Sequence, residues 1–566
     1  MTTLLRPLAA ALAAALLFGG CATRATAPVQ INLVGMNDFH GHLDPSKFEN
    51  NSIALPAPQS MQAGGIENIA AALQAWRLED KDLLVVGAGD MVGASPAMSS
   101  MWADEPTIAA LGMAGLFATS VGNHEFDQGR AELLRQQNGG CVSIRPDKAC
   151  KFGPEFQGAG YTYLAANVLD KATGKPFLPA YRIADVKGVK VGFIGAVLKD
   201  TASVVLASGI VGLSFVDEAD AINQVMPELR AKGAKVFVVL IHEGGQTSEP
   251  FDKADCSQLQ GPIVGIVKRL DPAIRLIISG HTHKGFQCKV DGRTVTQAEM
   301  GGHVLSRISM QVDPSSGVVL DIKVRNTMVK AGLYPPHQQV EAFLKMTRAR
   351  SKQALLAPLA KVSARSMTRK ASPAGESALG DLIADAVLAS ARAQGAQIGF
   401  MNAGGLRQDL DVGEDMTASF GQVQIVLPFG NTIVSMDLTG AELRDVLEQQ
   451  FVRLNGAHAS VLQVSNGFSY SWDASKAPGQ RVVPGSLMLN GTPIEDKRTY
   501  RVAANNFLAE GGDNFFAFAK ARNKIDSQVK DMDAVIGYLV KHDEAGTPAG
   551  IAAPAGRIQV IGTPQH

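Results

Sequence analysis

A short polar segment, residues 122–127, brings together side chains suited to acid–base chemistry and metal binding. Asn123 offers an amide oxygen to a metal ion, His124 can give or take a proton near neutral pH, and Asp127 can orient that imidazole. A Gly-Asn pair before charged residues is also a common turn and helix start. The segment therefore points to chemistry only if similar residues gather around it.

Further histidines and acidic residues follow short apolar runs elsewhere in the first half of the chain. They are Asp38, His40, Asp90, His242, His281 and His283. With Asn123 they supply imidazole, carboxylate and amide ligands but no thiolate, which suits Zn, Mn, Co or Fe better than Ca. Two such ions, about 3.5–4 Å apart, can clamp the attacking and leaving oxygens of a phosphoryl displacement. We therefore expect a two-metal site.

The elements that must position these residues are short runs rich in β-branched residues, each of which predicts a buried strand. They cover residues 31–36, 83–86, 117–121, 190–197, 236–241 and 274–278. Ile66, Ile69, Leu73 and Trp76 fall at helical spacing between the first two runs. This alternation indicates an α/β domain with helices covering a sheet. Because ligands bind beyond the carboxyl ends of such strands, the candidate metal ligands are expected to converge there.

Composition bounds the class of protein. The chain has 566 residues, of which 46% are hydrophobic and 19% charged, so it is expected to be globular. This length allows about two to four domains. Lys+Arg and Asp+Glu both number 53, and this balance gives no indication of a nucleic-acid polymer as partner.

The first residues predict export. One positive charge in residues 1–6, an Ala/Leu run at 7–18 and then Gly19-Gly20-Cys21 form the layout of a secretory signal, and the run is too short to span a membrane. Residues 17–21 also resemble a bacterial lipobox, in which Cys21 would carry lipid. Phe18 departs from the usual aliphatic residue, so the alternative is cleavage that leaves Cys21 free or removes it. Ala22 resembles the outer-membrane sorting pattern of Gram-negative bacteria, which implies a periplasmic or cell-envelope lipoprotein.

An oxidising compartment permits disulfides among the remaining cysteines. These are Cys141, Cys150, Cys256 and Cys288, which allow three pairings. We favour Cys141 with Cys150, closing a short loop, and Cys256 with Cys288, tying two loops near the expected metal site. The alternative is four unpaired buried thiols.

A composition shift near residues 331–358 predicts a joint between domains, with a helical stripe after Pro335-Pro336 as a connector. In the second half, residues 402–407 combine glycines, which let the backbone approach a ligand, with Arg407, whose planar guanidinium can grip a phosphate. Alone, the glycine pair would indicate a turn. Thr439 and Glu442 predict a capping box that opens a helix.

The combined motifs resemble a known family. Asp38-x-His40, Gly89-Asp90, residues 122–127, His242 and Gly280-His281-x-His283 resemble, in this order, the signature of the calcineurin-like metallophosphoesterases. With residues 402–407, 427–431 and 505–513, they are similar to the secreted 5'-nucleotidases, which include the bacterial periplasmic UDP-sugar hydrolase/5'-nucleotidase and the ecto-5'-nucleotidases.

This resemblance implies an α/β fold in three parts after a signal at residues 1–21. The parts are an N-terminal metallophosphoesterase β-sandwich flanked by helices at 29–330, a connector helix at 331–358, and an α/β substrate-recognition domain at 359–562. The family resemblance also implies that the domains can rotate about the connector.

The resemblance further implies roles at the metal site. Asp38, His40, Asp90 and His283 would surround one ion, and Asp90, Asn123, His242 and His281 the other, with Asp90 bridging. Position 283 is often Gln or Asn in this branch. His124 would donate to the phosphate or leaving oxygen, Asp127 would orient it, and metal-activated water would attack. His42 is expected to support the ligands from outside the metal shell or to be structural, and His303 is expected to pack beside the site rather than bind a metal.

In the second domain the resemblance implies a nucleoside pocket. Phe429 and Phe507 would sandwich the base, since stacking on aromatic rings tolerates any base, and Asp513 would bind the ribose hydroxyls. The other residues of this pocket would be Asn431, Arg407, Arg369 and Asn402, and the last three would lie on the phosphate side. An insert at residues 371–375 disturbs the usual spacing after Arg369, so Arg365 is a rival.

The expected function is therefore an exported, metal-dependent 5'-nucleotidase. Alternatives within the class are a 2',3'-cyclic-nucleotide phosphodiesterase, a UDP-sugar or dinucleotide pyrophosphatase, and a thiosulfohydrolase, which should lack the stacking aromatics. Another class is a non-catalytic nucleotide-binding surface lipoprotein, against which every expected metal position carries a competent ligand. Oligomeric state is left open.

Overall fold

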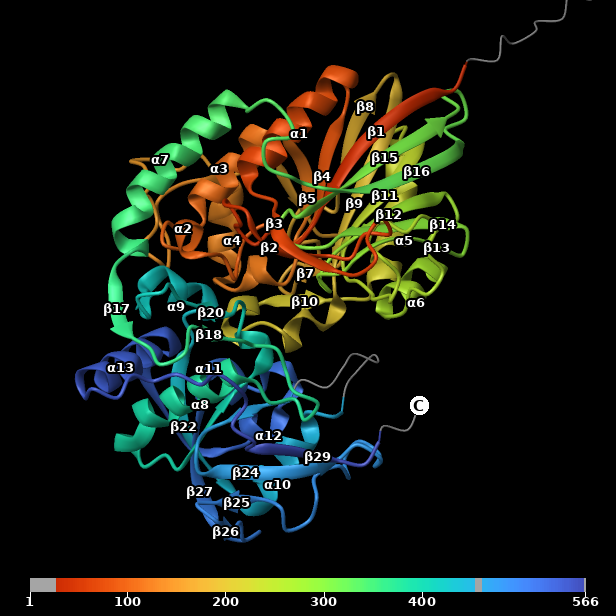
Figure 1. Cartoon of the computed structure of the whole chain (residues 1–566). Helices are drawn as coiled ribbons and strands as arrows, with labels where there is room; N and C mark the ends of the chain where they lie inside the picture. The colour runs from red at the N-terminus through yellow and green to blue at the C-terminus, as the bar shows by residue number, and fades with distance from the viewer. Residues whose placement is uncertain (1–26, 453–460, 564–566) are drawn as a thin grey trace, which may run out of the picture.

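The computed structural model describes residues 27–452 and 461–563. Figure 1 shows two bodies joined by the long helix α7 (Gln338–Leu355). The expected signal and Cys21 lie outside the described residues. Within these residues no helix combines the length and apolar character of a membrane span.

The first body contains two six-stranded sheets, in the orders β16-β15-β1-β4-β5-β6 and β13-β14-β12-β11-β9-β8. The first sheet consists of β1 (Val29–Met36), β4 (Leu84–Ala88), β5 (Leu116–Ser120), β6 (Thr162–Leu164), β15 (Val304–Val312) and β16 (Val319–Met328). The second consists of β8 (Tyr181–Val186), β9 (Val189–Val197), β11 (Val236–His242), β12 (Ile274–Ser279), β13 (Gly285–Val290) and β14 (Arg293–Ala298).

A continuous apolar core lies between the two sheets. Leu33 and Val86 of the first sheet belong to the same buried cluster as Phe193, Val238 and Ile278 of the second. The β-sandwich implied by the family resemblance is therefore confirmed. The strands expected from periodicity are divided between two sheets, which periodicity does not specify, because a buried apolar run does not reveal which sheet a strand joins.

Helices cover the outer faces of this sandwich. Ile66, Ile69, Leu73 and Trp76 of α1 (Ile66–Glu79) are buried, as their helical spacing predicts. The other helices of the first body are α2 (Ala97–Ser100), α3 (Glu105–Ala114), α4 (Gly129–Asn138), α5 (Glu218–Ala231) and α6 (Pro262–Arg269). Two short pairs, β2 (Ser46–Asn50) with β3 (Gln59–Ala63) and β7 (Val168–Asp170) with β10 (Leu213–Phe215), complete it.

Strand direction sets the position of the loops that matter. β1, β4 and β5 run parallel in the first sheet, and β9, β11 and β12 run parallel in the second. The loops after β1 and β4 are joined by backbone hydrogen bonds, from Asp38 N to Gly89 O at 3.0 Å and from His40 N to Asp90 O at 2.9 Å. The carboxyl ends of these strands therefore open on one rim of the sandwich.

The second body is built on a five-stranded sheet in the order β23-β19-β27-β22-β28. These strands are β19 (Ile398–Met401), β22 (Thr432–Thr439), β23 (Gln463–Val464), β27 (Thr499–Asn505) and β28 (Arg522–Lys530). A smaller sheet contains β24 (Phe468–Asp473), β25 (Met488–Leu489), β26 (Thr492–Pro493) and β29 (Ile558–Ile561). Short pairs join β17 (Pro358–Lys361) to β21 (Thr417–Ser419) and β18 (Ser366–Met367) to β20 (Leu410–Asp411).

The helices of the second body are α8 (Ala378–Ala391), α9 (Phe420–Val426), α10 (Gly440–Gln449), α11 (Asn506–Ala509), α12 (Phe516–Ala519) and α13 (Asp531–Glu544). The predicted capping box is present at α10, where Thr439 and Glu442 bond each other's backbone N–H groups. An equivalent box, Ser419 with Gln422, opens α9. The caps fix where both helices begin.

Helix α7 packs along the first body before the chain enters the second. The Trp102 indole donates to Ser351 Oγ at 3.0 Å, and Arg348 of α7 pairs with Glu67 of α1 at 3.1 Å. Across the joint, the buried Gln424 of α9 donates to Ser100 Oγ of α2 at 2.7 Å. The two bodies are thus in direct contact beside the rim described above.

Candidate metal centre and nucleotide pocket

The seven candidate ligands gather at the rim of the sandwich. Asp38 and His40 follow β1, Asp90 follows β4, Asn123 follows β5, His242 ends β11, and His281 and His283 follow β12. All are buried except the two partly exposed residues His281 and His283. The strands of both sheets contribute, so the centre forms only when the sandwich closes.

One group consists of Asp38, His40 and His283, whose ligand atoms lie within 4.8 Å of one another. His283 Nε2 lies 3.3 Å from Asp38 Oδ1 and 3.1 Å from His40 Nε2. His40 Nε2 also lies 3.7 Å from Asp90 Oδ2. Distances of this size are expected between side chains that coordinate the same cation.

The second group contains Asp38, Asp90 and His242. His242 Nε2 lies 3.0 Å from Asp90 Oδ2 and 3.9 Å from Asp38 Oδ1. Nearby, His281 Nδ1 and Asn123 Oδ1 are 3.1 Å apart. Asp38 belongs to both groups, and Asp90 Oδ2 lies 3.0 Å from His242 Nε2 and 3.7 Å from His40 Nε2 of the first group.

Ring orientation shows that these residues fit divalent metal ions. Nδ1 of His40 donates to Gly93 O at 2.9 Å, and Nδ1 of His242 donates to Ala88 O at 2.8 Å. Each ring therefore turns the lone pair of Nε2 toward the centre, the arrangement that backbone carbonyls impose on metal-binding histidines. His242 Nε2 is fully buried and makes no well-directed hydrogen bond to any described residue. An N/O donor set with such an unsatisfied atom suits the metals expected from the sequence.

The backbone is strained where the ligands lie. Five of them have left-handed φ angles: Asp38 (48°), His40 (47°), Asp90 (53°), His281 (77°) and His283 (55°). Non-glycine residues adopt this region only when the surroundings enforce it, and such strain concentrates at functional sites. Neighbouring glycines give the necessary space, since a Cβ on Gly122 would lie 2.1 Å from Asp90 Oδ1.

The carboxylates create a strongly negative field at the centre. Burial alone would lower the pKa of His242, but Asp90 and then Asp38 raise it to about 10. His281 is held neutral instead, because burial and then His242 lower its pKa to about 3. A field that favours a proton on His242 also favours a bound cation in its place.

Glu125 holds the ligand loops in place, a role that sequence reasoning missed although the residue lies inside the quoted motif. Its carboxylate accepts from Asp90 N at 2.9 Å and from Met91 N at 2.8 Å after β4, and from Gly122 N after β5. Asn37 acts similarly on Asp38, donating to its Oδ2 at 2.7 Å. Glu125 and Asn37 are recognised as supports of the ligand loops only from their burial, which the sequence does not show.

His124 and Asp127 lie beside the ligands. His124 Nδ1 and Asp127 Oδ2 are 2.8 Å apart, with side chains 12% and 15% exposed. Burial lowers the pKa of His124, but Asp127 and Asp90 outweigh it and raise the pKa overall. The imidazole is thus oriented by one carboxylate and poised to donate a proton.

The two histidines not expected to be ligands are both buried, and His42 lines a small recess together with His40 and His283. His303 bonds Glu299 Oε2 through Nδ1 and Ser46 Oγ through Nε2, both at 2.6 Å. His42 is buried, and burial lowers its pKa to about 3. Neither belongs to a ligand group identified among the described residues.

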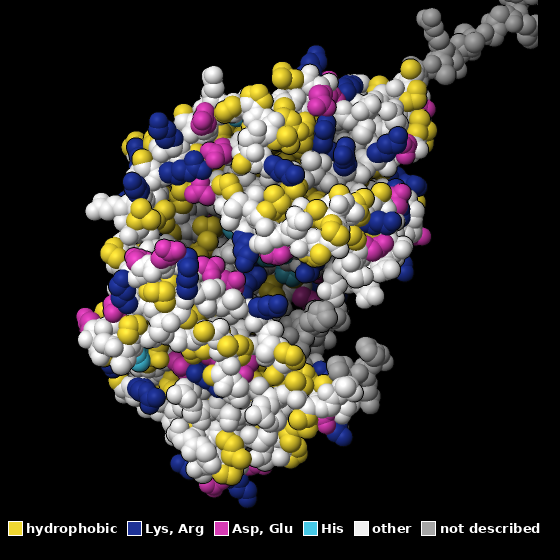
Figure 2. Space-filling model, in the orientation of Figure 1, with side chains coloured by type: hydrophobic (Ala, Val, Ile, Leu, Met, Phe, Trp, Pro, Cys, Tyr) yellow, Lys and Arg dark blue, Asp and Glu magenta, His cyan; other side chains and the backbone are white. Residues whose placement is uncertain are grey.

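A cavity of about 590 Å³ opens from the centre toward the second body. Figure 2 shows a hollow between the two bodies in which histidine, acidic and basic side chains gather. The first body contributes Asn123, His124, Asp127 and His281 to its wall, and the second contributes Asn402, Arg407, Phe429, Asn431, Phe507 and Asp513. Metal-centre and pocket residues predicted from separate halves of the sequence therefore face the same space.

Contacts within the second body organise its side of the cavity. Asn402 Nδ2 donates to Asp513 Oδ2 at 2.9 Å, and Asn402 Oδ1 accepts from Asn505 Nδ2 at 3.0 Å. Arg407 lies 5.7 Å from the centre of the Phe429 ring, which places a cation near an aromatic face. These contacts fix the polar groups on a loop that follows β19.

The structure distinguishes the two rival arginines. Arg369 donates to Leu406 O at 3.0 Å and lines a small recess with His40, His283 and Arg407. Arg365 is 64% exposed and pairs with Glu414 at 3.8 Å. The structure therefore brings Arg369, and not Arg365, beside the candidate metal ligands.

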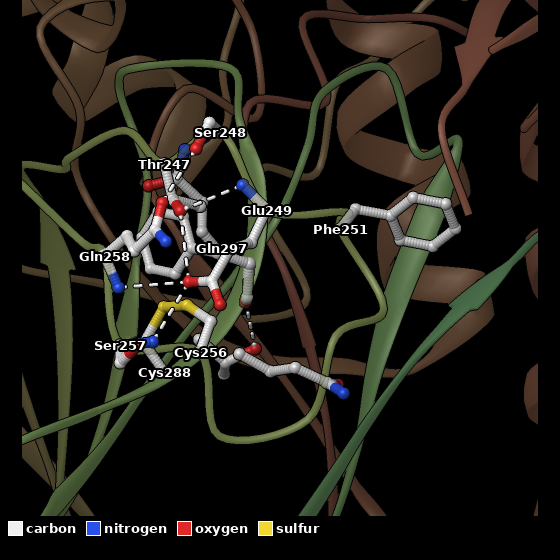
Figure 3. The surroundings of a disulfide bond; sticks show 12 residues. Thr247, Ser248, Glu249, Phe251, Cys256, Ser257, Gln258, Cys288 and Gln297 are labelled. Atoms are coloured by element: carbon white, nitrogen blue, oxygen red, sulfur yellow. Dashed lines mark hydrogen bonds between the residues drawn. A yellow bond between two sulfur atoms is a disulfide. The ribbon is translucent and has the colours of Figure 1, made fainter. Parts of the chain in front are cut away.

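Both favoured disulfides are present in the structure. Cys141 is joined to Cys150 after α4, and Cys256 to Cys288 on β13. Figure 3 shows the second bond beside Glu249, whose carboxylate accepts from Ser257 N and Gln258 N, both at 3.0 Å. This bond fastens the loop after β11 to the second sheet.

Comparisons with known proteins cover both bodies. Residues 31–285 match the family described as calcineurin-like phosphoesterase, and residues 352–520 match the 5'-nucleotidase C-terminal domain. The chain is 30% identical to "Endonuclease YhcR" of Bacillus subtilis over 93% of this chain and 41% of that protein. It is also 30% identical to "Cell wall protein Lmo0130" of Listeria monocytogenes over 93% of this chain and 69% of that protein.

A solved structure shows the same family similarity in three dimensions. The 5'-nucleotidase precursor from Thermus thermophilus is 25% identical, with a TM-score of 0.76 over 95% of this chain and all of that one. The likeness spans both bodies and the helix that joins them.

Proposed function

We propose that this chain, which belongs to the calcineurin-like phosphoesterases with a 5'-nucleotidase C-terminal domain, hydrolyses nucleoside 5'-monophosphates to nucleoside and phosphate. One observation carries the proposal. Two candidate metal ligands, Asn123 and His281, and the candidate nucleoside-binding residues line one cavity from opposite bodies. In this proposal residues 29–330 perform the chemistry, residues 359–562 recognise the nucleoside, and residues 331–358 connect them.

Two divalent ions are assigned to the residues described above. Asp38, His40 and His283 would hold one ion, and Asn123, His242 and His281 the other, with Asp90 shared. When bound, such ions supply Lewis acidity and activate water at neutral pH. The protein's own part is to fix imidazole nitrogens and carboxylate oxygens at one rim through backbone hydrogen bonds and Glu125.

His124 is the proposed proton donor. Its Nδ1 is held by Asp127 at 2.8 Å, so Nε2 is the atom that donates to the leaving ribose oxygen as negative charge develops there. Asp127 fixes the ring orientation and stabilises its protonated form. General acid catalysis of this kind contributes about 10²–10⁴-fold to a rate.

The second body binds the phosphate side, the ribose and the base of the nucleotide. Arg407, Arg369 and Asn402 face the phosphate side, and Asp513 with Asn431 bind polar groups of the nucleoside. Phe429 and Phe507 give the base aromatic surfaces on which to stack. Such stacking contributes about 1–3 kcal/mol, so Phe507→Ala is expected to raise the KM for AMP about 5- to 150-fold.

The chain is further proposed to act in the cell envelope. The signal-like residues 1–21 and Cys21 support export and lipid anchoring to an outer membrane, and one relative is described as a cell wall protein. Two disulfides agree with an oxidising compartment.

The test is a substrate panel of AMP, UDP-glucose and 2',3'-cyclic AMP, assayed by phosphate or nucleoside release with Mn or Zn and with chelator. We expect metal-dependent hydrolysis of AMP that Asp90→Asn abolishes and Phe507→Ala weakens through KM. Phe516→Ala, at an exposed aromatic of the same body, serves as the matched control. Preference for UDP-glucose or the cyclic nucleotide would replace the 5'-nucleotidase proposal with the corresponding alternative. Activity on none of them would leave a binding protein or a thiosulfohydrolase.

A further inference from the structure

The aromatic ring of Phe429 lies against the imidazole of His124 across the contact between the two bodies. Their ring centres are 5.5 Å apart and the planes differ by 19°, which is a stacked arrangement. His124 belongs to the turn η1 (His124–Phe126) after β5, whereas Phe429 lies in the loop between α9 and β22. The pair therefore exists only when the two bodies are apposed as in this structure.

Two further contacts of the imidazole come from its own body. Asp127 bonds Nδ1 in the ring plane at 2.8 Å. The ring of His40 meets it edge-on, with centres 5.2 Å apart and planes at 72°. Of these two aromatic neighbours, Phe429 is thus the one that covers a face of the imidazole.

A stacked neighbour restricts rotation of the imidazole about its Cβ–Cγ bond. The single hydrogen bond to Asp127 fixes one ring atom but leaves the plane free to tilt, and a flat aromatic surface removes that freedom. The Phe429 ring also lies 5.7 Å from the guanidinium of Arg407, a cation–aromatic contact that helps to hold the ring in place.

We propose that Phe429 is a positioning residue for His124, in addition to its role as a base-stacking surface. By supplying one wall of the imidazole site from the second body, Phe429 makes accurate placement of the proton donor depend on apposition of the two bodies. This inference rests on the proposed function, in which His124 donates to the leaving oxygen.

A role in base recognition alone predicts different behaviour. If Phe429 served only the base, its loss would not matter for a phosphate ester that has no nucleoside. If it positions His124, its loss lowers turnover of any ester whose leaving oxygen needs the proton. A substrate without a nucleoside therefore separates the two roles.

The first experiment compares AMP with ribose 5-phosphate, which has the same leaving oxygen but no base, for the wild type, Phe429→Ala, Phe429→Tyr and Phe507→Ala, with Mn in excess. Phe429→Ala is expected to lower kcat for ribose 5-phosphate about tenfold with little change in KM, because a misplaced catalytic group costs rate more than binding. Phe429→Tyr, which keeps the ring, should restore most of that kcat. Phe507→Ala should act mainly through the KM for AMP, and Phe516→Ala serves as the unchanged control.

Equal effects of Phe429→Ala and Phe507→Ala on ribose 5-phosphate would overturn the inference. Failure of the wild type to hydrolyse AMP while it hydrolyses ribose 5-phosphate would instead overturn the nucleotidase proposal, and the effect of Phe429→Ala on ribose 5-phosphate would still test the inference.

A second measurement does not depend on activity. Diethyl pyrocarbonate modifies accessible imidazoles, and the rate at His124 can be followed by peptide mass spectrometry, with His542 of the second body as internal standard. Phe429→Ala should raise the relative rate at His124 about threefold or more, and Phe429→Tyr should not. An unchanged rate in Phe429→Ala would contradict the stacked arrangement.

Discussion

The Nε2 atoms of His40 and His283 lie 3.1 Å apart at the rim of the sandwich. Nδ1 of His40 is occupied by the carbonyl of Gly93, so the lone pair of His40 Nε2 points toward His283. Two ring nitrogens at this distance repel each other unless a proton or a cation lies between them. Asp38 Oδ1, 3.3 Å from His283 Nε2, completes a cation-binding group.

His283→Ala should therefore weaken metal binding without unfolding the protein. We expect the Mn concentration that gives half-maximal activity to rise about tenfold or more, as losses of metal-site residues commonly do. His283→Gln, which keeps an oxygen ligand, should restore most of the affinity, and His542→Ala should leave it unchanged. A metal requirement that is the same in His283→Ala and the wild type would remove His283 from the ligand set.

Glu125→Gln should destabilise the first body and lower activity together. The Gln amide keeps only one acceptor oxygen, so its NH2 group would face either the N–H of Met91 or the N–H groups of Asp90 and Gly122, leaving buried donors unpaired. A loss of about 1–3 kcal/mol in the free energy of unfolding corresponds to a fall in Tm of roughly 2–12 °C for large domains. Scanning calorimetry with Glu49→Gln, an exposed position, as control tests this, and equal melting of the two variants would argue against it.

Stability of the second body should fall as the pH rises toward neutrality, because of Asp531. Burial raises its pKa to about 7, and its Oδ2 has no hydrogen-bond partner among the described residues. The folded protein thus binds a proton that the unfolded chain releases near pH 4, so stability is lost between about pH 4 and 7.

Asp531→Asn removes this titration. The variant should melt at a higher temperature than the wild type at pH 8, and the difference should vanish near pH 4.5. Asp533→Asn, an exposed carboxyl in the same helical turn, is the control and should show no such trend. A pH-independent difference for Asp531→Asn would show that the carboxyl does not titrate as described.

The two disulfides should differ in their resistance to reduction. Cys256 and Cys288 are each 1% exposed, whereas Cys141 lies at the surface. Mild dithiothreitol followed by alkylation and mass spectrometry should label Cys141 and Cys150 first. In the loop-entropy description, removing the bond that closes 32 residues costs about 4 kcal/mol and the one that closes 9 about 3 kcal/mol. Simultaneous reduction of both pairs would contradict the burial argument.

Much of this site could be predicted because its residues follow buried strands directly. Asp38 after β1, Asp90 after β4 and His281 after β12 mark the strand ends, and topology then brings them together. The pairing of strands into two sheets was not readable from periodicity, because β1 and β9 have similar apolar runs. The supporting role of Glu125 was also hidden, since it depends on three-dimensional burial.

Contacts between the two bodies were the features that the sequence predicted least well. Spacing in the sequence left Arg369 and Arg365 as rivals, and only the packed structure places Arg369 beside His40 and His283. The stacking of Phe429 on His124 depends on how separately folded bodies meet, which no local pattern encodes.

The most direct test of a two-metal nucleotidase counts bound metal against activity. Metal-free protein is loaded stepwise with Mn or Zn, and phosphate release from AMP and metal content by mass spectrometry are measured on the same samples. We predict that activity rises to a plateau as the second ion binds, and that Asp90→Asn, which removes the shared charge, stays inactive at every loading. Full AMP hydrolysis by metal-free protein in the presence of chelator would contradict the proposed chemistry.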